Sequence, residues 1–181
     1  MILQSDAEVF CSPGQITEAI KSARDAGWVL PFTHFYKLNQ MRSSRTLKQP
    51  PTFSPSHMKF KKVKLYRHTY SVGRKRENPK ITYIDNARII GYLMAIRRDA
   101  WYGYDERFIG WGFEDVAFQI SMTTLIGEQS RIEGNLYHLW HPLAARLRSI
   151  KSGQLEKNRE LCLRYSQAAG NKESIRELLG Q

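Results

Sequence analysis

The sequence has few cysteines, no long apolar run and, over one stretch, no acidic residue. Cys11 and Cys162 are the two cysteines among 181 residues, too few for a disulfide framework and without the spacing of metal ligands. Such sparse cysteine usage is typical of a reducing compartment, so we expect a cytoplasmic protein. Because no apolar run reaches the roughly 18 to 20 residues that cross a bilayer, we expect no membrane span.

Acidic residues are missing between Asp25 and Glu77. The segment 26–76 holds 12 of the 28 lysine and arginine residues and no aspartate or glutamate. The other 16 basic residues are balanced by all 17 acidic residues, so the formal net charge of +11 comes from this one segment. A basic segment favours anionic partners, nucleic acid first among them. The alternative is a loop whose lysines simply stay in water.

The apolar pattern predicts an α/β protein. A short strand at Met1–Leu3 precedes a helix that Ser12 caps and Gly27 ends, and a buried strand follows over 28–32. Strand, helix and strand in succession are typical of an α/β layer. The other predicted elements are strands over 81–84, 89–96 and 131–140 and helices over 114–126, 154–168 and 172–179. Prolines and basic residues predict a long loop over about 39–80, with a strand near 63–70.

Two carboxylates follow the first apolar strand. Asp6 and Glu8 are two residues apart, and side chains at i and i+2 of a strand point the same way. Both can therefore face one hard cation such as Mg²⁺ or Mn²⁺, which prefers oxygen ligands. The alternative is a solvated turn whose acids favour the positive end of the next helix.

The second motif places two glycines around Trp111, just before a helix that opens with Glu114 and Asp115. Glycine lets the backbone approach a ligand closely, and a tryptophan face can stack on a sugar ring. A carboxylate at this point can accept a hydroxyl proton as a general base. The alternative is a helix start with a buried tryptophan and acids that suit the helix dipole.

The third motif contains His138 and His141, near the end of the last predicted strand. A neutral imidazole there can complete a cation site with the early carboxylates. The alternative is a structural histidine held by hydrogen bonds.

In this order, the motifs resemble the C-terminal part of nucleotide-sugar glycosyltransferases of the GT-A fold, in particular family 2 enzymes and the galactosyltransferase C-terminal domain. The run 104–115, YDERFIGWGFED, is similar to the family's F-D-E-R-F-x-G-W-G-x-E-D. Residues 6–9 look like its DxD element, residues 91–98 like the strand leading to its acceptor site, and residues 138–142 match its late histidine. The resemblance covers nearly the whole chain apart from the basic loop.

The resemblance implies an inverting glycosyltransferase that transfers a sugar from a nucleotide-sugar donor to the hydroxyl of a glycan or another acceptor. It also implies a divalent cation, Mn²⁺ or Mg²⁺. By this resemblance, Asp115 is the catalytic base. The implied acceptor-binding residues are Trp111, Gly112 and Glu114. The implied metal ligands are Asp6, Glu8 and His138, with His141 as an alternative to His138.

The chain departs from the family at three places. Glu8 stands where aspartate is usual, and Phe113 stands where glycine is common, which narrows the expected acceptor pocket. In the family, strands that bind the nucleotide precede the DxD strand, which here begins at Met1. We therefore expect a partial GT-A-type mixed sheet with flanking helices, from a truncated or split enzyme that works with a separate N-terminal half chain.

The expected organisation is a DxD and acceptor-binding portion over 1–153, followed by a helical tail over 154–181. Two alternatives to an active transferase remain open. The basic segment, with its interleaved aromatic residues, favours a nucleic-acid-binding module. A non-catalytic glycosyltransferase remnant would keep the fold without turnover.

Overall fold

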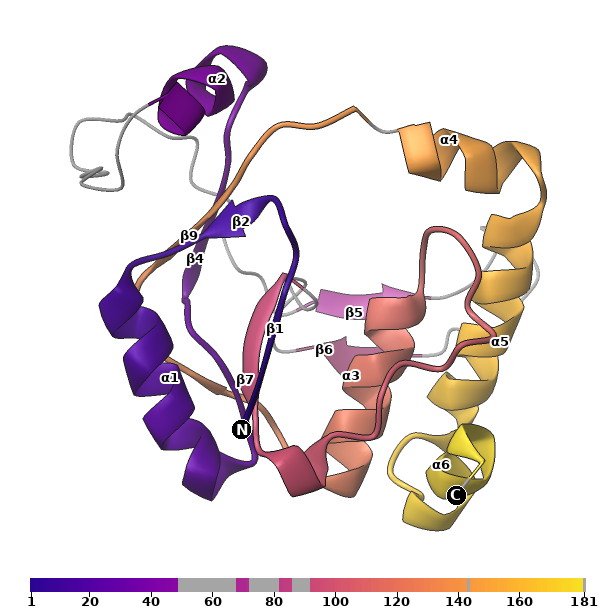
Figure 1. The fold of residues 1–181 in the computed structure, drawn as a ribbon. Coiled ribbons are helices and arrows are strands. Elements are labelled where there is room, and N and C mark those ends of the chain that lie inside the picture. The colour runs from indigo at the N-terminus through magenta and orange to yellow at the C-terminus, as the bar shows by residue number, and fades with distance from the viewer. Residues whose placement is uncertain (49–67, 72–81, 86–91, 143, 181) are drawn as a thin grey trace. The chain divides into compact units, whose positions relative to one another are not determined.

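The computed structural model describes residues 1–48, 68–71, 82–85, 92–142 and 144–180. Helices and strands alternate along the chain (Figure 1). The two larger sheets contain both parallel and antiparallel pairs, and this architecture confirms the α/β class. The chain divides into two compact units, described in turn below. The described residues of the first unit are 1–48, 92–96 and 130–142, and those of the second are 68–71, 82–85, 97–129 and 144–180.

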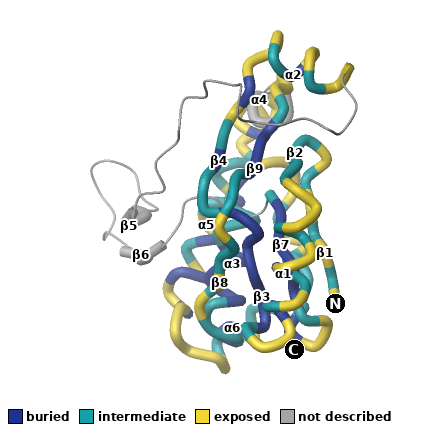
Figure 2. The backbone as a smooth tube through the Cα atoms, turned by 90° about the vertical axis from the view of Figure 1, so that its left-hand side faces the viewer, coloured by how far each residue is buried: buried dark blue, intermediate teal, exposed yellow. Residues whose placement is uncertain are grey.

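A four-stranded sheet forms the centre of the first unit. Its order is β1 (Ile2–Ser5), β7 (Leu93–Ile96), β3 (Trp28–Leu30) and β8 (Ser130–Arg131). Strand β7 runs antiparallel to β1 and to β3, whereas β3 and β8 are parallel. Strands β3 and β7 are buried along their whole length (Figure 2), but Leu3 of the edge strand β1 is 45% exposed.

Helix α1 (Pro13–Ala26) packs against β3 and β7. It begins as predicted, because the Ser12 hydroxyl accepts the Gln15 N–H while the Gln15 side chain accepts the Ser12 N–H. Small side chains allow the helix to lie close to the sheet. The fully buried members of this contact are Ala19, Ala23, Val29 and Ala95.

A second, three-stranded sheet in this unit has the order β2 (Val9–Phe10), β9 (Asn135–His138) and β4 (His34–Lys37). Strand β9 is antiparallel to β2 and parallel to β4. The Tyr137 ring stacks between Phe10 and Tyr36, with centroid distances of 5.2 and 5.5 Å.

Two predicted elements of the first unit differ from the structure. The expected loop over 39–80 contains a helix, α2 (Gln40–Lys48), which begins where the Asn39 side chain accepts the Arg42 N–H. The expected strand over 131–140 is two short strands, β8 and β9, in different sheets. Between them the Gly134 carbonyl accepts the N–H groups of Thr33 and His34, so the chain turns from one sheet to the other.

The second unit is mainly helical. A 3-10 turn, η2 (Arg98–Ala100), precedes α3 (Glu114–Leu125), and α4 (Ala144–Lys151), α5 (Gln154–Ala168) and α6 (Lys172–Leu179) follow. Helices α3, α5 and α6 pack on one another. Their shared core consists of Ala117, Ile120, Leu125, Tyr165, Ala168 and Ile175. The bounds of α5 and α6 are as predicted. Helix α4 was not predicted from the sequence.

An antiparallel pair, β5 (His68–Ser71) and β6 (Thr82–Asp85), also belongs to this unit. Strand β6 confirms the predicted strand over 82–84, and residue 81 lies outside the described residues. Most of the strand predicted near 63–70 lies outside the described residues, as do 89–91 of the strand predicted over 89–96.

Candidate functional site

Asp6 and Glu8 lie in the turn that joins β1 to β2, not on a strand. Side chains at i and i+2 share a face only within a strand, so the expectation that Asp6 and Glu8 point the same way does not apply here. The Asp6 N–H donates to the Tyr92 carbonyl at 2.9 Å, and the Glu8 carbonyl accepts the Leu139 N–H at 2.8 Å. The backbone of the turn is thus held beside the start of β7 and the end of β9.

His138 ends β9 and is only 8% exposed. Its ring lies edge-on to Phe35 and Tyr92, at 5.9 and 5.3 Å, and 5.1 Å from the His141 ring. Burial lowers the pKa of His138, and the electrostatic effects of the neighbouring Lys37 and His141 lower it further. The imidazole is therefore neutral at pH 7, the form that binds a metal.

The donor chemistry of the predicted metal ligands suits a hard divalent cation, but their present arrangement is incomplete. Glu8 lies close enough to His138 to oppose the lowering of its pKa. Within the described ranges, however, no three His, Cys, Asp or Glu side chains are grouped so that they could hold an ion. The structure thus places Glu8 near His138 and leaves the three-ligand set with Asp6 a prediction.

In the second unit, the predicted acceptor loop turns sharply before α3. Gly110, Gly112 and Phe113 all have positive φ values, of 79°, 112° and 74°. Phe113 is the one non-glycine residue with positive φ in the part of the chain that the structure describes. The phenylalanine that departs from the family pattern thus takes a conformation that glycine adopts without strain.

Helices α4 and α5 hold this loop in place. The Trp111 N–H donates to the Ser149 hydroxyl at 2.9 Å. The buried Asn158 side chain donates to the carbonyls of Ile109 and Gly112, at 3.1 and 3.0 Å. Fixed at these three backbone groups, the loop presents Trp111 with 39% of its surface exposed.

The two acids that open α3 have different partners. Glu114 turns back and accepts the Gly112 N–H at 2.8 Å, so its carboxylate supports the loop. Asp115 accepts a hydrogen bond from the Tyr104 hydroxyl at 3.5 Å. The Tyr104 ring stacks on Phe118, with centroids 4.6 Å apart, which orients its hydroxyl toward Asp115.

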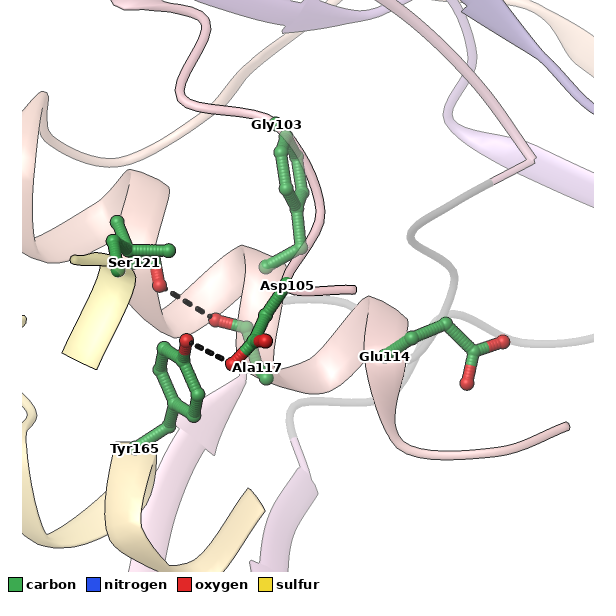
Figure 3. Close-up of a pocket in the computed structure, with 8 residues that line it drawn as sticks. Gly103, Asp105, Glu114, Ala117, Ser121 and Tyr165 are labelled. Carbon is green, nitrogen blue, oxygen red and sulfur yellow. Dashed lines mark hydrogen bonds between the residues drawn. The ribbon is translucent and has the colours of Figure 1, made fainter. Parts of the chain in front are cut away.

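Asp105 anchors the start of the loop. Its carboxylate accepts a hydrogen bond from Arg107 Nε at 2.8 Å. It also accepts one from the Tyr165 hydroxyl at 2.7 Å (Figure 3). The Arg107 Nη2 also donates to the Leu178 carbonyl of α6. Burial by itself would raise the pKa of Asp105, but the hydrogen bonds from Arg107 and Tyr165 hold it below its usual range.

A small cavity adjoins this anchor and is lined in part by Asp105, Tyr165 and Glu114. In Figure 3 the Tyr165 hydroxyl meets Asp105, whereas the Glu114 carboxylate points away from that pair. Neither Asp115 nor Trp111 lines the cavity. The cavity therefore lies beside the hydrogen-bonded pair Asp105 and Tyr165 and not beside Asp115, the predicted base.

Sequence reasoning missed the residues that support the loop before α3 in the second unit and those that surround His138 in the first. Ser149, Asn158 and Tyr165 reach the loop from helices far along the chain. Lys37 lies beside His138 only because β4 and β9 pair in parallel. Tyr104 lies within the recognised motif, but its role toward Asp115 depends on the packing of Phe118. No local signal in the sequence marks these contacts.

Both cysteines are free thiols. Burial raises the pKa of Cys11 to about 11 and that of Cys162 to about 12, so neither is ionised at neutral pH. A nucleophilic cysteine is reactive as the thiolate, which these environments disfavour.

Comparison of the chain with family models, with curated proteins and with solved structures gives no match. None of the described helices combines the length and the apolar composition needed to cross a bilayer.

Proposed function

We propose that this protein is a glycosyltransferase, or the C-terminal half of one, with a partial GT-A-type sheet. It would transfer a sugar from a nucleotide-sugar donor to an acceptor hydroxyl with inversion. The observation that carries this proposal is the placement of Asp115 in the first turn of α3, with the Tyr104 hydroxyl on its carboxylate. The preceding loop is held by Ser149 and Asn158 and exposes Trp111.

In the proposed reaction, Asp115 accepts the proton of the acceptor hydroxyl. The oxygen forms the new bond to the anomeric carbon, while the bond to the diphosphate breaks and its electron pair leaves with the nucleotide. One displacement of this kind inverts the anomeric carbon. The exposed Trp111 offers a face on which an acceptor sugar can stack. Glu114 supports this loop through the Gly112 N–H.

A divalent cation, Mn²⁺ or Mg²⁺, is part of the proposal, with Asp6, Glu8 and His138 as its ligands. When bound, the ion would neutralise charge on the leaving diphosphate. The neutral state of His138 supports this role, since an imidazolium cannot bind a metal.

A separate chain that binds the nucleotide base is the proposed partner. In the described sheet, β1 hydrogen-bonds to β7 on one side and is the edge strand on the other. An exposed edge strand offers free backbone groups to a strand of another chain.

The test is release of the nucleotide from a panel of nucleotide sugars, with and without Mn²⁺ and simple sugar acceptors. Asp115→Asn keeps the shape of the side chain but removes the base, so we expect a loss of at least about a hundredfold in rate. Asp25→Asn, on the exposed end of α1, is the matched control and should keep the wild-type rate. Equal rates for Asp115→Asn and wild type would contradict the assignment of the base.

Nucleic-acid binding is a second candidate, favoured by α2. This helix carries Arg42, Arg45 and Lys48 and no acidic residue. Binding to random-sequence DNA that weakens steeply with salt would support this function, because released counterions drive such binding. If the protein binds DNA in this way but releases no nucleotide from any sugar donor, nucleic-acid binding replaces transfer as the function.

A further inference from the structure

Helix α2 continues the chain beyond β4, at the end of the three-stranded sheet of the first unit (Figure 1). The buried Ser43 hydroxyl accepts the Trp140 N–H at 2.7 Å, and this bond fixes which side of α2 faces the protein. Among the described strands and helices, none packs extensively against α2. The side of α2 away from Ser43 is therefore open to a partner.

The open side of α2 carries basic and apolar side chains together. Residues four and seven apart lie on one face of a helix, so Met41, Arg45 and Lys48 share a face. Arg45 and Lys48 are exposed, and Met41 is 57% exposed. Leu47, in the last turn of the helix, is 73% exposed. Two cations and two large apolar side chains thus face water on a helix of nine residues.

The charge on this part of the chain has one sign. No acidic residue occurs between residues 26 and 48. Among the described residues, no carboxylate forms an ion pair with Arg45 or Lys48. Both side chains are therefore available to an anionic partner.

The exposed apolar side chains distinguish between anionic partners. A nucleic-acid backbone is bound through its phosphates and gives Met41 and Leu47 nothing apolar to contact. A lipid surface does, because apolar side chains can enter the boundary between head groups and acyl chains. Trp140, whose backbone is bonded to Ser43, is 45% exposed, and tryptophan favours the same boundary. The composition of this surface therefore suits an anionic lipid bilayer better than a nucleic acid.

We propose that α2 binds the surface of a membrane that contains anionic lipid. Met41 and Leu47 enter the boundary below the head groups, while Arg45 and Lys48 contact the lipid phosphates. A helix of nine residues is too short to cross a bilayer, so it lies on the surface. This inference goes beyond the proposed function and does not depend on transferase activity.

The test is sedimentation of the full chain with vesicles of phosphatidylcholine, either pure or mixed with phosphatidylglycerol. We expect wild type to bind the mixed vesicles, and less at high salt, which screens the charges. Arg45→Gln combined with Lys48→Gln should bind them roughly tenfold or more weakly. Lys21→Gln combined with Arg24→Gln is the matched control. It removes the same charge at the same spacing from exposed positions of α1, and it should bind as wild type does.

Leu47→Ser separates a lipid surface from other anionic partners. We expect this variant to bind the mixed vesicles several-fold more weakly, because it loses apolar surface that enters the membrane. Any binding to random-sequence DNA should not change. Met41→Ser is a second variant of the same kind, and thermal melting checks that each protein folds. Ile150→Ser, at an exposed apolar position of α4, is the control and should bind as wild type does.

Three results would overturn the inference. The first is a wild-type protein that does not bind the mixed vesicles, whether or not it binds DNA. The second is wild-type affinity when Arg45 and Lys48 are both replaced by glutamine. The third is wild-type affinity in both Leu47→Ser and Met41→Ser, which would show that charge alone attracts the protein.

Discussion

The Tyr104 hydroxyl donates a hydrogen bond to Asp115 across 3.5 Å, while the Tyr104 ring stacks on Phe118 one turn further along α3. Helix α3 thus carries both Asp115, the proposed base, and Phe118, whose ring orients Tyr104. Removing the hydroxyl should therefore disturb Asp115 without disturbing the packing.

Tyr104→Phe tests this relationship. The variant keeps the stacked ring and loses the hydrogen bond, so we expect a change in unfolding free energy of at most about 1 kcal/mol. We also expect the rate of nucleotide release to fall several-fold, because Asp115 loses the group that orients it. The matched control is Tyr102→Phe, and its rate should equal that of wild type. A Tyr104→Phe protein with the wild-type rate would show that Asp115 does not depend on Tyr104.

Asp105 is expected to contribute to the stability of the second unit. Asp105→Asn loses the charged acceptor that Arg107 and Tyr165 share, and we expect a loss of about 2 kcal/mol in urea unfolding. The value is modest because the Arg107 side chain is 48% exposed and water screens the pair. Asp99→Asn, in a surface pair with Arg97, should cause no measurable loss. Equal stabilities for the two variants would refute the role of Asp105.

The same carboxylate should make stability depend on acid pH. Its pKa is lower in the folded protein than in the unfolded chain, so the unfolded chain binds more protons as the pH falls. The stabilisation is fully present above the ordinary carboxyl pKa of about 3.9 and is lost as the pH falls through the lower folded value. Between these two values, the unfolding free energy of Asp105→Asn should fall less steeply with decreasing pH than that of wild type. Parallel curves for the two proteins would rule out this source of acid sensitivity.

Gly110 and Gly103 form a matched pair for testing how the acceptor loop is held. Both have nearly the same φ, 79° and 80°, so alanine at either position should cost about 1 kcal/mol of backbone strain. At Gly103 no described residue beyond its two chain neighbours has an atom within 4 Å of an added Cβ, whereas at Gly110 the Ser149 hydroxyl would lie 2.7 Å away.

Gly110→Ala should therefore displace Ser149 and break its hydrogen bond to the Trp111 N–H. We expect its loss in thermal and urea stability to exceed that of Gly103→Ala by about 1 kcal/mol. Its Trp111 fluorescence should also shift. Identical losses in the two variants would show that Ser149 does not hold the loop.

The metal prediction is tested by calorimetric titration with Mn²⁺. His138→Ala should weaken Mn²⁺ binding roughly tenfold or more, because it removes a predicted ligand. Its control is His34→Ala on the opposite face of the same sheet, which should bind Mn²⁺ as wild type does. Unchanged affinity in His138→Ala would remove this histidine from the proposed metal site.

Local sequence signals predicted the elements that local physics controls. The cap at Ser12 and the helix-ending Gly27 set α1 as predicted, and α6 begins at the cap that Asn171 provides. Helix α2 was missed because the sequence around it is polar and rich in basic residues. The strand predicted over 131–140 proved to be β8 and β9, because backbone hydrogen bonds from Thr33 and His34 to Gly134 turn the chain between two sheets.

The sequence by itself determined the α/β class, the confinement of the +11 charge to residues 26–76, and the motif that contains Trp111 and Asp115. These features depend on composition and on neighbours within a few residues. Only the tertiary structure decided that Lys37 lies beside His138 and that Ser149 and Asn158 hold the loop. Such contacts depend on strand register and helix packing between distant residues, and no local pattern specifies either.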